Sequence, residues 1–299
     1  MRYQVIHITT YRYDQPVAQC LSEVHLAPRS LPRQRVLETI LEIVPQPAVM
    51  ERRVDYYGNE IASFSIFKRH DRFTVTATSL IEVAATPPEI SSRITWEETR
   101  AHLTLHPDEE SLAAYEFAFD SPFVAASPEL AAYGAASFRP GVPLVEAVID
   151  LSHRIHADFS YKPKSTSIDI PLHEVLKLRR GVCQDFAHLM IGVLRSYHLA
   201  ARYISGYLRS GAKILGAEAS HAWVSVFIPG HGWLDLDPTN DVLPSEGHVT
   251  VAWGRDYGDV TPVKGISLGG AGQTVDVDVR VVPITGLPVP NNSASELLI

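Results

Sequence analysis

The sequence has little cysteine: its 299 residues include only Cys20 and Cys183. Two thiols in a chain of this length exclude the disulfide framework that small secreted domains use. The first residues also lack the apolar segment and small-residue cleavage site of a secretory signal. We therefore expect a cytoplasmic, reducing location in which both cysteines stay free thiols.

Positive charge is also in short supply. Lys and Arg number 26 against 34 Asp and Glu, which gives a formal net charge of -8. Phosphate recognition needs a basic face, so this balance argues against a nucleic-acid partner or an anionic membrane surface. No stretch approaches the roughly 18 consecutive apolar residues of a membrane span. Hydrophobic residues at 45% and charged residues at 20% are typical of a globular protein.

Hydrophobic periodicity divides the chain into a β-rich part and a part that mixes helices with strands. Apolar and polar residues alternate along much of the first ninety residues, as in "RFTVTATSLIEV". The run "ATPPEISS" at 85–92 has the composition of a linker, and helical spacing follows it. Strand-like alternation returns from residue 201 and again at 274–284. This order predicts an α+β fold with two domains.

Cys183 stands at the predicted start of a helix. The helix is defined by apolar residues with the spacing of one helical face, namely Phe186, Leu189, Met190, Val193, Leu194 and Tyr197. A thiol is a weak nucleophile because its usual pKa is about 8.5, but a helix N-terminus and a nearby imidazolium both favour the thiolate. Taken alone, such a cysteine is more often a buried thiol. A nucleophile therefore requires a histidine from elsewhere in the chain.

Among the 13 histidines, His221 has the most informative position. It opens the predicted strand "HAWVSVFI", and the end of a strand can hold a side chain firmly toward a site. This strand and "GWLDLD" form a predicted hairpin around the turn "PGHG". Counting across the turn brings His221 near Asp237, while Asp235 lies on the same strand face. The local pattern thus finds a His–Asp pair without choosing between the two carboxylates.

Together these segments resemble a known family. "GVCQDFAH" and "HAWVSVFIPGHGWLDLDPTN" are closely similar to the transglutaminase-like superfamily, whose core is papain-like. "YRYDQPVAQC", "LAPR" and "YYGNEI" resemble the β region that precedes the core in bacterial members, and "VAWGRDYGDVTPVKG" resembles the segment that follows it. The resemblance implies that a helix bearing the cysteine packs on an antiparallel sheet. It further implies an N-terminal β domain at 1–90, a catalytic core at 91–255 and a C-terminal β segment at 256–299 that packs on the rest.

The family's catalytic triad falls on Cys183, His221 and Asp237, which leaves Asp235 as a strand residue. The resemblance implies a two-step acyl transfer in which Cys183 attacks an amide carbonyl of a peptide or protein and forms a thioester. His221 would transfer the proton, and Asp237 would orient the imidazole. Water as acceptor gives hydrolysis, which we favour, and an amine gives transamidation. Neither a metal nor an organic cofactor is expected.

The oxyanion hole is where the sequence departs from the family. Related enzymes add a side-chain donor, often Gln six residues before the cysteine or a Trp farther upstream, and neither stands at its place here. We expect Tyr161 to supply this donor instead. Gln184 and Asp185 are expected to provide polarity at the helix start or hydrogen bonds behind the nucleophile. Trp223 is expected to pack under the site.

Two other functions are open to the same residues. A catalytically silent binding module on this fold would keep the pattern of helix and strands, although an intact triad argues against it. A zinc site could use Cys183 and His221, with His188 as a further ligand. The paired C-x-x-C or H-x-x-x-H spacings that are typical of zinc sites do not occur near these residues. We therefore favour acyl transfer.

Overall fold

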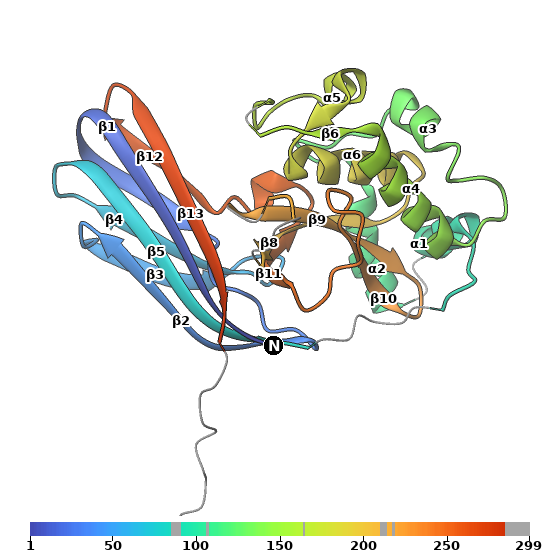
Figure 1. The fold of residues 1–299 in the computed structure, drawn as a ribbon, viewed down its shortest axis with the longest axis horizontal. Coiled ribbons are helices and arrows are strands. Elements are labelled where there is room, and N and C mark those ends of the chain that lie inside the picture. Colours follow the sequence, from blue (N-terminus) through green and yellow to red (C-terminus); the bar gives the residue numbers. More distant parts are fainter. Residues whose placement is uncertain (85–90, 106–107, 164, 210–213, 217–218, 285–299) are drawn as a thin grey trace, which may run out of the picture.

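The structure is a computed structural model, and it describes residues 1–84, 91–105, 108–163, 165–209, 214–216 and 219–284. A β-rich part and a part containing both helices and strands lie next to each other, on the left and right of Figure 1. The mixed α+β architecture predicted from the sequence is confirmed. Most of the predicted linker at 85–92 lies outside the described residues.

The β-rich part is a 7-stranded antiparallel sheet with the order β2-β5-β1-β4-β3, to which β12 and β13 are added by pairing with β1. Its strands are β1 Arg2–Val24, β2 Gln34–Val44, β3 Val49–Val54, β4 Glu60–Ile66, β5 His70–Val83, β12 Val263–Gly269 and β13 Gln273–Pro283. The first half of β1 pairs with β5 and β13, and its second half pairs with β4 and β12. Strands from both ends of the sequence therefore build one sheet.

Alternating apolar residues give this sheet its own core. Val17 and Cys20 of β1 pack with Phe73 and Val75 of β5 in a buried cluster. Cys20 is only 2% exposed, as expected for a thiol on an apolar strand face, and its Sγ lies 3.2 Å from the Ser22 hydroxyl. The strand pattern read from the sequence thus follows from burial of every second side chain.

The second part contains helices α1 to α6 and a 4-stranded antiparallel sheet with the order β10-β9-β8-β11. The sheet strands are β8 Ala201–Leu208, β9 His221–Ile228, β10 Gly232–Leu236 and β11 His248–Gly254. The helices are α1 Trp96–Leu105, α2 Glu109–Tyr115, α3 Pro128–Gly134, α4 Leu144–Asp158, α5 Leu172–Leu178 and α6 Cys183–Ser196, with short 3-10 turns η1 Glu116–Ala118 and η2 Tyr257–Asp259. Two short strands, β6 Ser160–Tyr161 and β7 Arg180–Gly181, pair in parallel.

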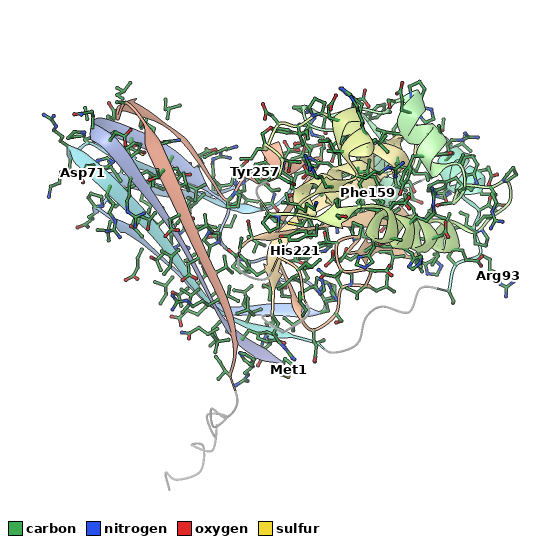
Figure 2. The ribbon with its side chains drawn as sticks, turned by 45° about the horizontal axis from the view of Figure 1, so that its top comes forward. Met1, Asp71, Arg93, Phe159, His221 and Tyr257 are labelled. Carbon is green, nitrogen blue, oxygen red and sulfur yellow. The ribbon has the colours of Figure 1, made fainter. Side chains whose placement is uncertain are left out.

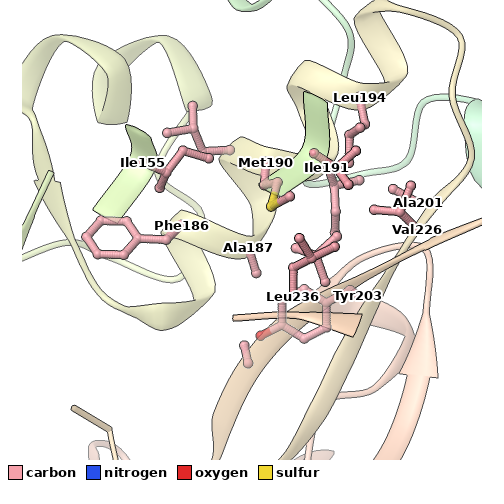
Figure 3. Packing of buried hydrophobic residues seen from close by; sticks show 14 of the residues in the cluster. Ile155, Phe186, Ala187, Met190, Ile191, Leu194, Ala201, Tyr203, Val226 and Leu236 are labelled. Carbon is pink, nitrogen blue, oxygen red and sulfur yellow. The ribbon is translucent and has the colours of Figure 1, made fainter. Parts of the chain in front are cut away.

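Helix α6 is the central element of this part. Its predicted apolar face is buried, with Phe186, Leu189 and Met190 each at most 1% exposed. Figure 3 shows this face against α4 and against side chains of the β8–β11 sheet, including Tyr203 and Val226. Because the apolar face of the helix is packed into the core, the helix cannot shift, and its first residue has a fixed position. That first residue is Cys183.

Specific polar contacts join the two parts. The side-chain amide of Gln34 donates from Nε2 to the Thr250 carbonyl at 2.7 Å, and its Oε1 accepts from the Thr250 N–H at 2.8 Å. The ring of His7 on β1 is hydrogen-bonded to Tyr207 of β8 at 2.9 Å, and both residues are buried. The N-terminal sheet is therefore attached to β8 and β11 of the second part. The residue boundaries of the three predicted segments stay predictions.

Candidate active site

The chain around Cys183 is shaped by local hydrogen bonds. Val182 is extended, and its N–H donates to the Asp185 carboxylate at 2.8 Å, while the Thr166 hydroxyl donates to the same oxygen at 2.7 Å. A side chain on Gly181 would place its Cβ 2.5 Å from that oxygen, so glycine is required for the carboxylate to fold back. Burial raises the pKa of Asp185, and the two donors oppose this effect. Cys183 itself is partly exposed.

His221 and Asp237 come from adjacent strands and form a buried pair. His221 is the first residue of β9, and Asp237 follows β10 in a bridge to Val242. His221 Nε2 lies 2.8 Å from Asp237 Oδ2, and neither side chain is exposed to solvent. Figure 2 shows His221 near the middle of the molecule, at the level where the two parts meet.

The electrostatics of this pair favour an imidazolium. Burial lowers the pKa of His221, but the Asp237 carboxylate and the Cys183 sulfur outweigh burial and raise this pKa to about 10. Burial alone would raise the pKa of Asp237, because it disfavours the charged carboxylate. The histidine partners of Asp237 outweigh burial and hold this pKa well below its usual range. Cys183 is among the groups that raise this pKa, which places the thiol near the imidazole. Since Nε2 is taken by Asp237, Nδ1 is the nitrogen left for proton transfer.

Two further side chains hold the Asp237 carboxylate, and the sequence analysis did not single them out. His248, the first residue of β11, lies with Nε2 at 3.2 Å from Asp237 Oδ2. The Asn240 side-chain amide donates to the same oxygen at 2.9 Å. The other oxygen accepts from the backbone N–H groups of Thr239 and Asn240 at 3.0 and 3.2 Å. Asn240 belongs to the "DPTN" motif and His248 opens a strand, as His221 does, so both positions carried a signal.

A short surface segment lies over the imidazole. Gly216 has a φ of +83°, and a Cβ there would stand 2.7 Å from His221 Nδ1. The side chain of Asn240 holds this segment, residues 214–216, through two hydrogen bonds to Leu215. Asn240 Oδ1 accepts from the Leu215 N–H at 2.9 Å, and Asn240 Nδ2 donates to the Leu215 carbonyl at 3.3 Å. Asn240 therefore connects the covering segment with the carboxylate of Asp237.

Trp223 and Asp235 occupy the same sheet face but do not join the pair. The indole of Trp223 stacks on the His221 ring with centroids 6.1 Å apart, and it is completely buried. The Asp235 carboxylate accepts from Trp223 Nε1 at 3.4 Å and faces Arg33 at 3.5 Å. In the hairpin, Asp235 lies opposite Ser225. Continuing this register places Asp237 opposite Trp223 and therefore diagonally across from His221. Of the two carboxylates, the structure brings Asp237 to the histidine.

The family profiles match the two parts of the fold separately. The bacterial transglutaminase-like N-terminal region matches residues 3–82, and the transglutaminase-like superfamily matches residues 135–238. The chain belongs to the transglutaminase-like superfamily. The second matched segment begins directly after α3, ends just past β10 and includes Cys183, His221 and Asp237.

Individual relatives of this transglutaminase-like chain match different shares of it. An uncharacterized protein of Mycobacterium tuberculosis is 40% identical over 95% of this chain and 94% of its own length. A protein-glutamine gamma-glutamyltransferase of Pseudomonas aeruginosa is 35% identical over 97 residues, which are 30% of this chain and 14% of that protein. The crystal structure of a candidate cysteine protease of Cytophaga hutchinsonii superimposes with a TM-score of 0.75 and 20% identity, over 96% of this chain and 93% of that one. This superposition confirms the fold.

The remaining residues expected at the transglutaminase-like site have identifiable places. Tyr161 of β6 pairs with Gly181 of β7 and packs partly buried against the core. Gln184 Nε2 donates to the Ile168 carbonyl at 2.8 Å. His188 is buried, and its Nε2 accepts from the Tyr257 N–H at 3.1 Å. The oxyanion role of Tyr161 stays a prediction.

Over the described ranges, no group of three or more His, Cys, Asp or Glu residues is arranged to hold a metal ion. No helix in the described part of the chain is long and apolar enough to cross a membrane.

Proposed function

We propose that the protein is a cysteine-dependent amide hydrolase that acts on peptide or protein substrates through a thioester on Cys183. The observation that carries the proposal is the buried His221–Asp237 pair, whose free nitrogen adjoins a thiol at the head of α6. A helix N-terminus favours negative charge, and an adjacent imidazolium favours a thiolate. The site therefore has the parts of an activated nucleophile.

The proposed reaction has two steps that use the same residues. In the first, the sulfur of Cys183 attacks the amide carbonyl carbon, its proton passes to His221 Nδ1, and His221 returns the proton to the departing amine. In the second, His221 takes a proton from water, the hydroxide attacks the thioester, and the carboxylic acid leaves as the thiol re-forms. Asp237 keeps the Nε2 proton in place throughout, so Nδ1 is the nitrogen that exchanges protons.

The nucleophile is tested by the rate at which iodoacetamide alkylates Cys183 at pH 6. An ordinary thiol with a pKa of about 8.5 is only about 0.3% thiolate at this pH. We expect the native protein to react faster than such a thiol, by up to about two orders of magnitude, and His221→Ala to remove the excess. Mass spectrometry separates Cys183 from the buried Cys20.

The two carboxylates of β10 supply a matched control. Asp237→Asn should slow alkylation of Cys183 at least about tenfold, because the imidazolium loses its partner. Asp235→Asn changes a carboxylate on the same strand face that contacts Trp223 and Arg33, and it should leave the rate nearly unchanged. Equal rates in all variants would contradict an activated nucleophile and would favour a silent binding module.

The acyl acceptor is tested with an electrophilic peptide library and then with the selected peptides as amide substrates. Hydrolysis predicts the free carboxylic acid as product and one released amine per turnover. A product that contains an added amine, formed only when a primary amine is supplied, would instead assign transamidation. Mass spectrometry of the Cys183 adduct identifies the acyl group.

The proposal includes a cytoplasmic, reducing location. Cys20 and Cys183 are both free thiols, and a thiolate nucleophile must stay reduced to act. Fractionation of cells that produce the full chain, followed by thiol labelling before and after reduction, tests this point. Recovery outside the cytoplasm or an oxidised Cys183 would refute it.

A further inference from the structure

A cavity of about 600 Å³ lies between the N-terminal sheet and the β8–β11 sheet, apart from Cys183. Its floor is the sheet face that also carries His221, and its walls come from both parts of the fold. The lining is mainly apolar and includes Leu31, Ile204, Trp233, Leu243 and Trp253. A volume of this size is typical of pockets for small organic molecules.

One arginine on the cavity floor has no anionic partner. Arg202 lines the cavity, and in the described part of the chain no carboxylate lies within ion-pair distance of its guanidinium. Its Nε is buried without a hydrogen-bond partner among the described residues. Burial lowers the pKa of Arg202 to about 9, so the group still carries its charge at neutral pH. The Asp235 carboxylate of the lining raises this pKa from beyond ion-pair distance, but it pairs with Arg33. A buried charge without a direct ion-pair partner is costly, which makes it a place where an anion binds.

The surroundings of Arg202 leave the edge of its guanidinium available. The guanidinium carbon lies 4.2 Å from the centroid of Trp233 and 3.8 Å from that of Trp253, so the two indoles cover its faces. Stacking on the faces does not use the N–H groups, which lie in the plane and match a carboxylate in bidentate fashion. Arg33, the second cation of the lining, is already taken by the Pro244 carbonyl at 2.7 Å and by Asp235 at 3.5 Å.

A second polar group under the cavity is also unsatisfied. Ser225 is the cross-strand neighbour of two lining residues, Arg202 and Asp235. Its side chain is fully buried, and its Oγ has no partner among the described residues. Native interiors rarely leave two neighbouring polar groups unpaired without a reason. A ligand whose acceptor group lies in the cavity next to Arg202 would give its guanidinium a hydrogen-bond partner.

We propose that this cavity is an accessory binding site for a small amphipathic carboxylate, whose acid group binds Arg202 and whose apolar body fills the space beside Leu31, Leu243 and the two indoles. The proposal does not depend on the proposed hydrolase activity, because none of these residues belongs to the Cys183 site. The carboxylate is chosen because Arg202, unlike Arg33, has no ion pair with any described residue, and the apolar body because most lining residues are apolar.

The test uses 4-phenylbutyrate as the probe and its neutral amide, 4-phenylbutanamide, as the control ligand. Binding to the full chain is measured by isothermal titration calorimetry and by saturation-transfer NMR. We expect the acid to bind about tenfold more tightly than the amide, because a hydrogen bond to a charged group contributes a factor of this size. Equal affinities, or no saturable binding of the acid up to about 10 mM, would overturn the proposal.

Three variants locate the site. Arg202→Met keeps a long side chain between the indoles but removes the charge, and it should reduce the acid to the affinity of the amide. Arg209→Met changes an exposed arginine just beyond the same strand and outside the lining, and it should bind like the native protein. Ala84→Trp adds bulk at the exposed rim and should weaken both ligands about tenfold. Native-like binding by Arg202→Met and Ala84→Trp, each with an unchanged melting temperature, would refute the assignment.

Discussion

Replacing His248 with phenylalanine removes one of the N–H groups that hold the Asp237 carboxylate. The ring of His248 packs edge-on against Trp223 with centroids 5.4 Å apart, and phenylalanine preserves this packing. The change therefore isolates the hydrogen bond from Nε2 to Asp237 Oδ2. Burial lowers the pKa of His248, so the native ring is a neutral donor at neutral pH.

The size of the effect follows from burial and distance. A hydrogen bond to a charged group contributes about 1.5–3 kcal/mol, and this bond at 3.2 Å is longer than the one from His221 at 2.8 Å. Asp237 also keeps its bonds from Asn240 and from the backbone. We expect a loss of about 2 kcal/mol in the free energy of unfolding, or roughly 4–8 °C in the melting temperature. With one donor fewer, the carboxylate attracts the imidazolium more strongly, and the pKa of His221 rises further.

Thermal and urea unfolding measure the loss, and the pH dependence of Cys183 alkylation measures the shift at His221. His153→Phe is the matched control, because His153 pairs with Asp241 at 2.8 Å while 66% of its side chain is exposed. Solvent screens an exposed ion pair, so the control should change the stability little. His248→Gln keeps an N–H group and should recover part of the loss. Equal losses in the phenylalanine variants at 248 and 153 would refute this account.

Three other predictions concern a glycine, a buried histidine and a buried arginine. Gly216→Ala should slow Cys183 alkylation, because the new Cβ would displace His221. Gly230 is the control: its φ of +74° is similar, but a Cβ there would have no atom within 4 Å, so Gly230→Ala should leave the rate unchanged. Equal rates in the two variants would contradict the contact with His221. Burial lowers the pKa of His7 to about 4, below the value near 6.5 expected in the unfolded chain, so its contribution to stability is complete above pH 6.5 and is lost as the pH falls toward 4. His7→Phe should therefore make urea unfolding less sensitive to acid by about 3 kcal/mol over this interval, and an unchanged slope would count against it. Arg195→Met should lose about 3–5 kcal/mol of unfolding free energy, since the buried guanidinium donates to several backbone carbonyls; a loss below about 1 kcal/mol would show that these bonds matter little.

The sequence was sufficient to predict the elements that carry the site. A glycine followed by an amphipathic run indicates where α6 begins, and burial of that run holds Cys183 in place. Alternation likewise indicates that His221 opens a strand. The membership of the transglutaminase-like superfamily and the α+β fold are both confirmed. These features depend on periodicities of two and 3.6 residues, which are local.

The features that the sequence could not supply depend on register and on distant contacts. A period of two places Asp235 and Asp237 on one face but does not tell which one reaches the histidine, since that depends on the turn. The left-handed residue that ends α5 is Arg179, with a φ of 50°, and the nearby Gly181 makes room for the Asp185 carboxylate. The strand that His248 opens is a local pattern, but its contact with Asp237 is not, and neither are the contacts of the segment at 214–216 and of the N-terminal sheet.

The pairing of β1 with β12 and β13 has a consequence for how the protein is made. During synthesis β1 emerges before the other described strands, yet one edge of β1 stays unpaired at Val5 until Val281 of β13 has been made. Until then the sheet presents an open edge, the kind of surface on which strands of other chains add. Pairing over such a sequence separation is slow, because the loop must close first. The core that contains Cys183 is synthesised between β1 and β13, so β13 closes a sheet that was begun before any residue of the candidate active site existed.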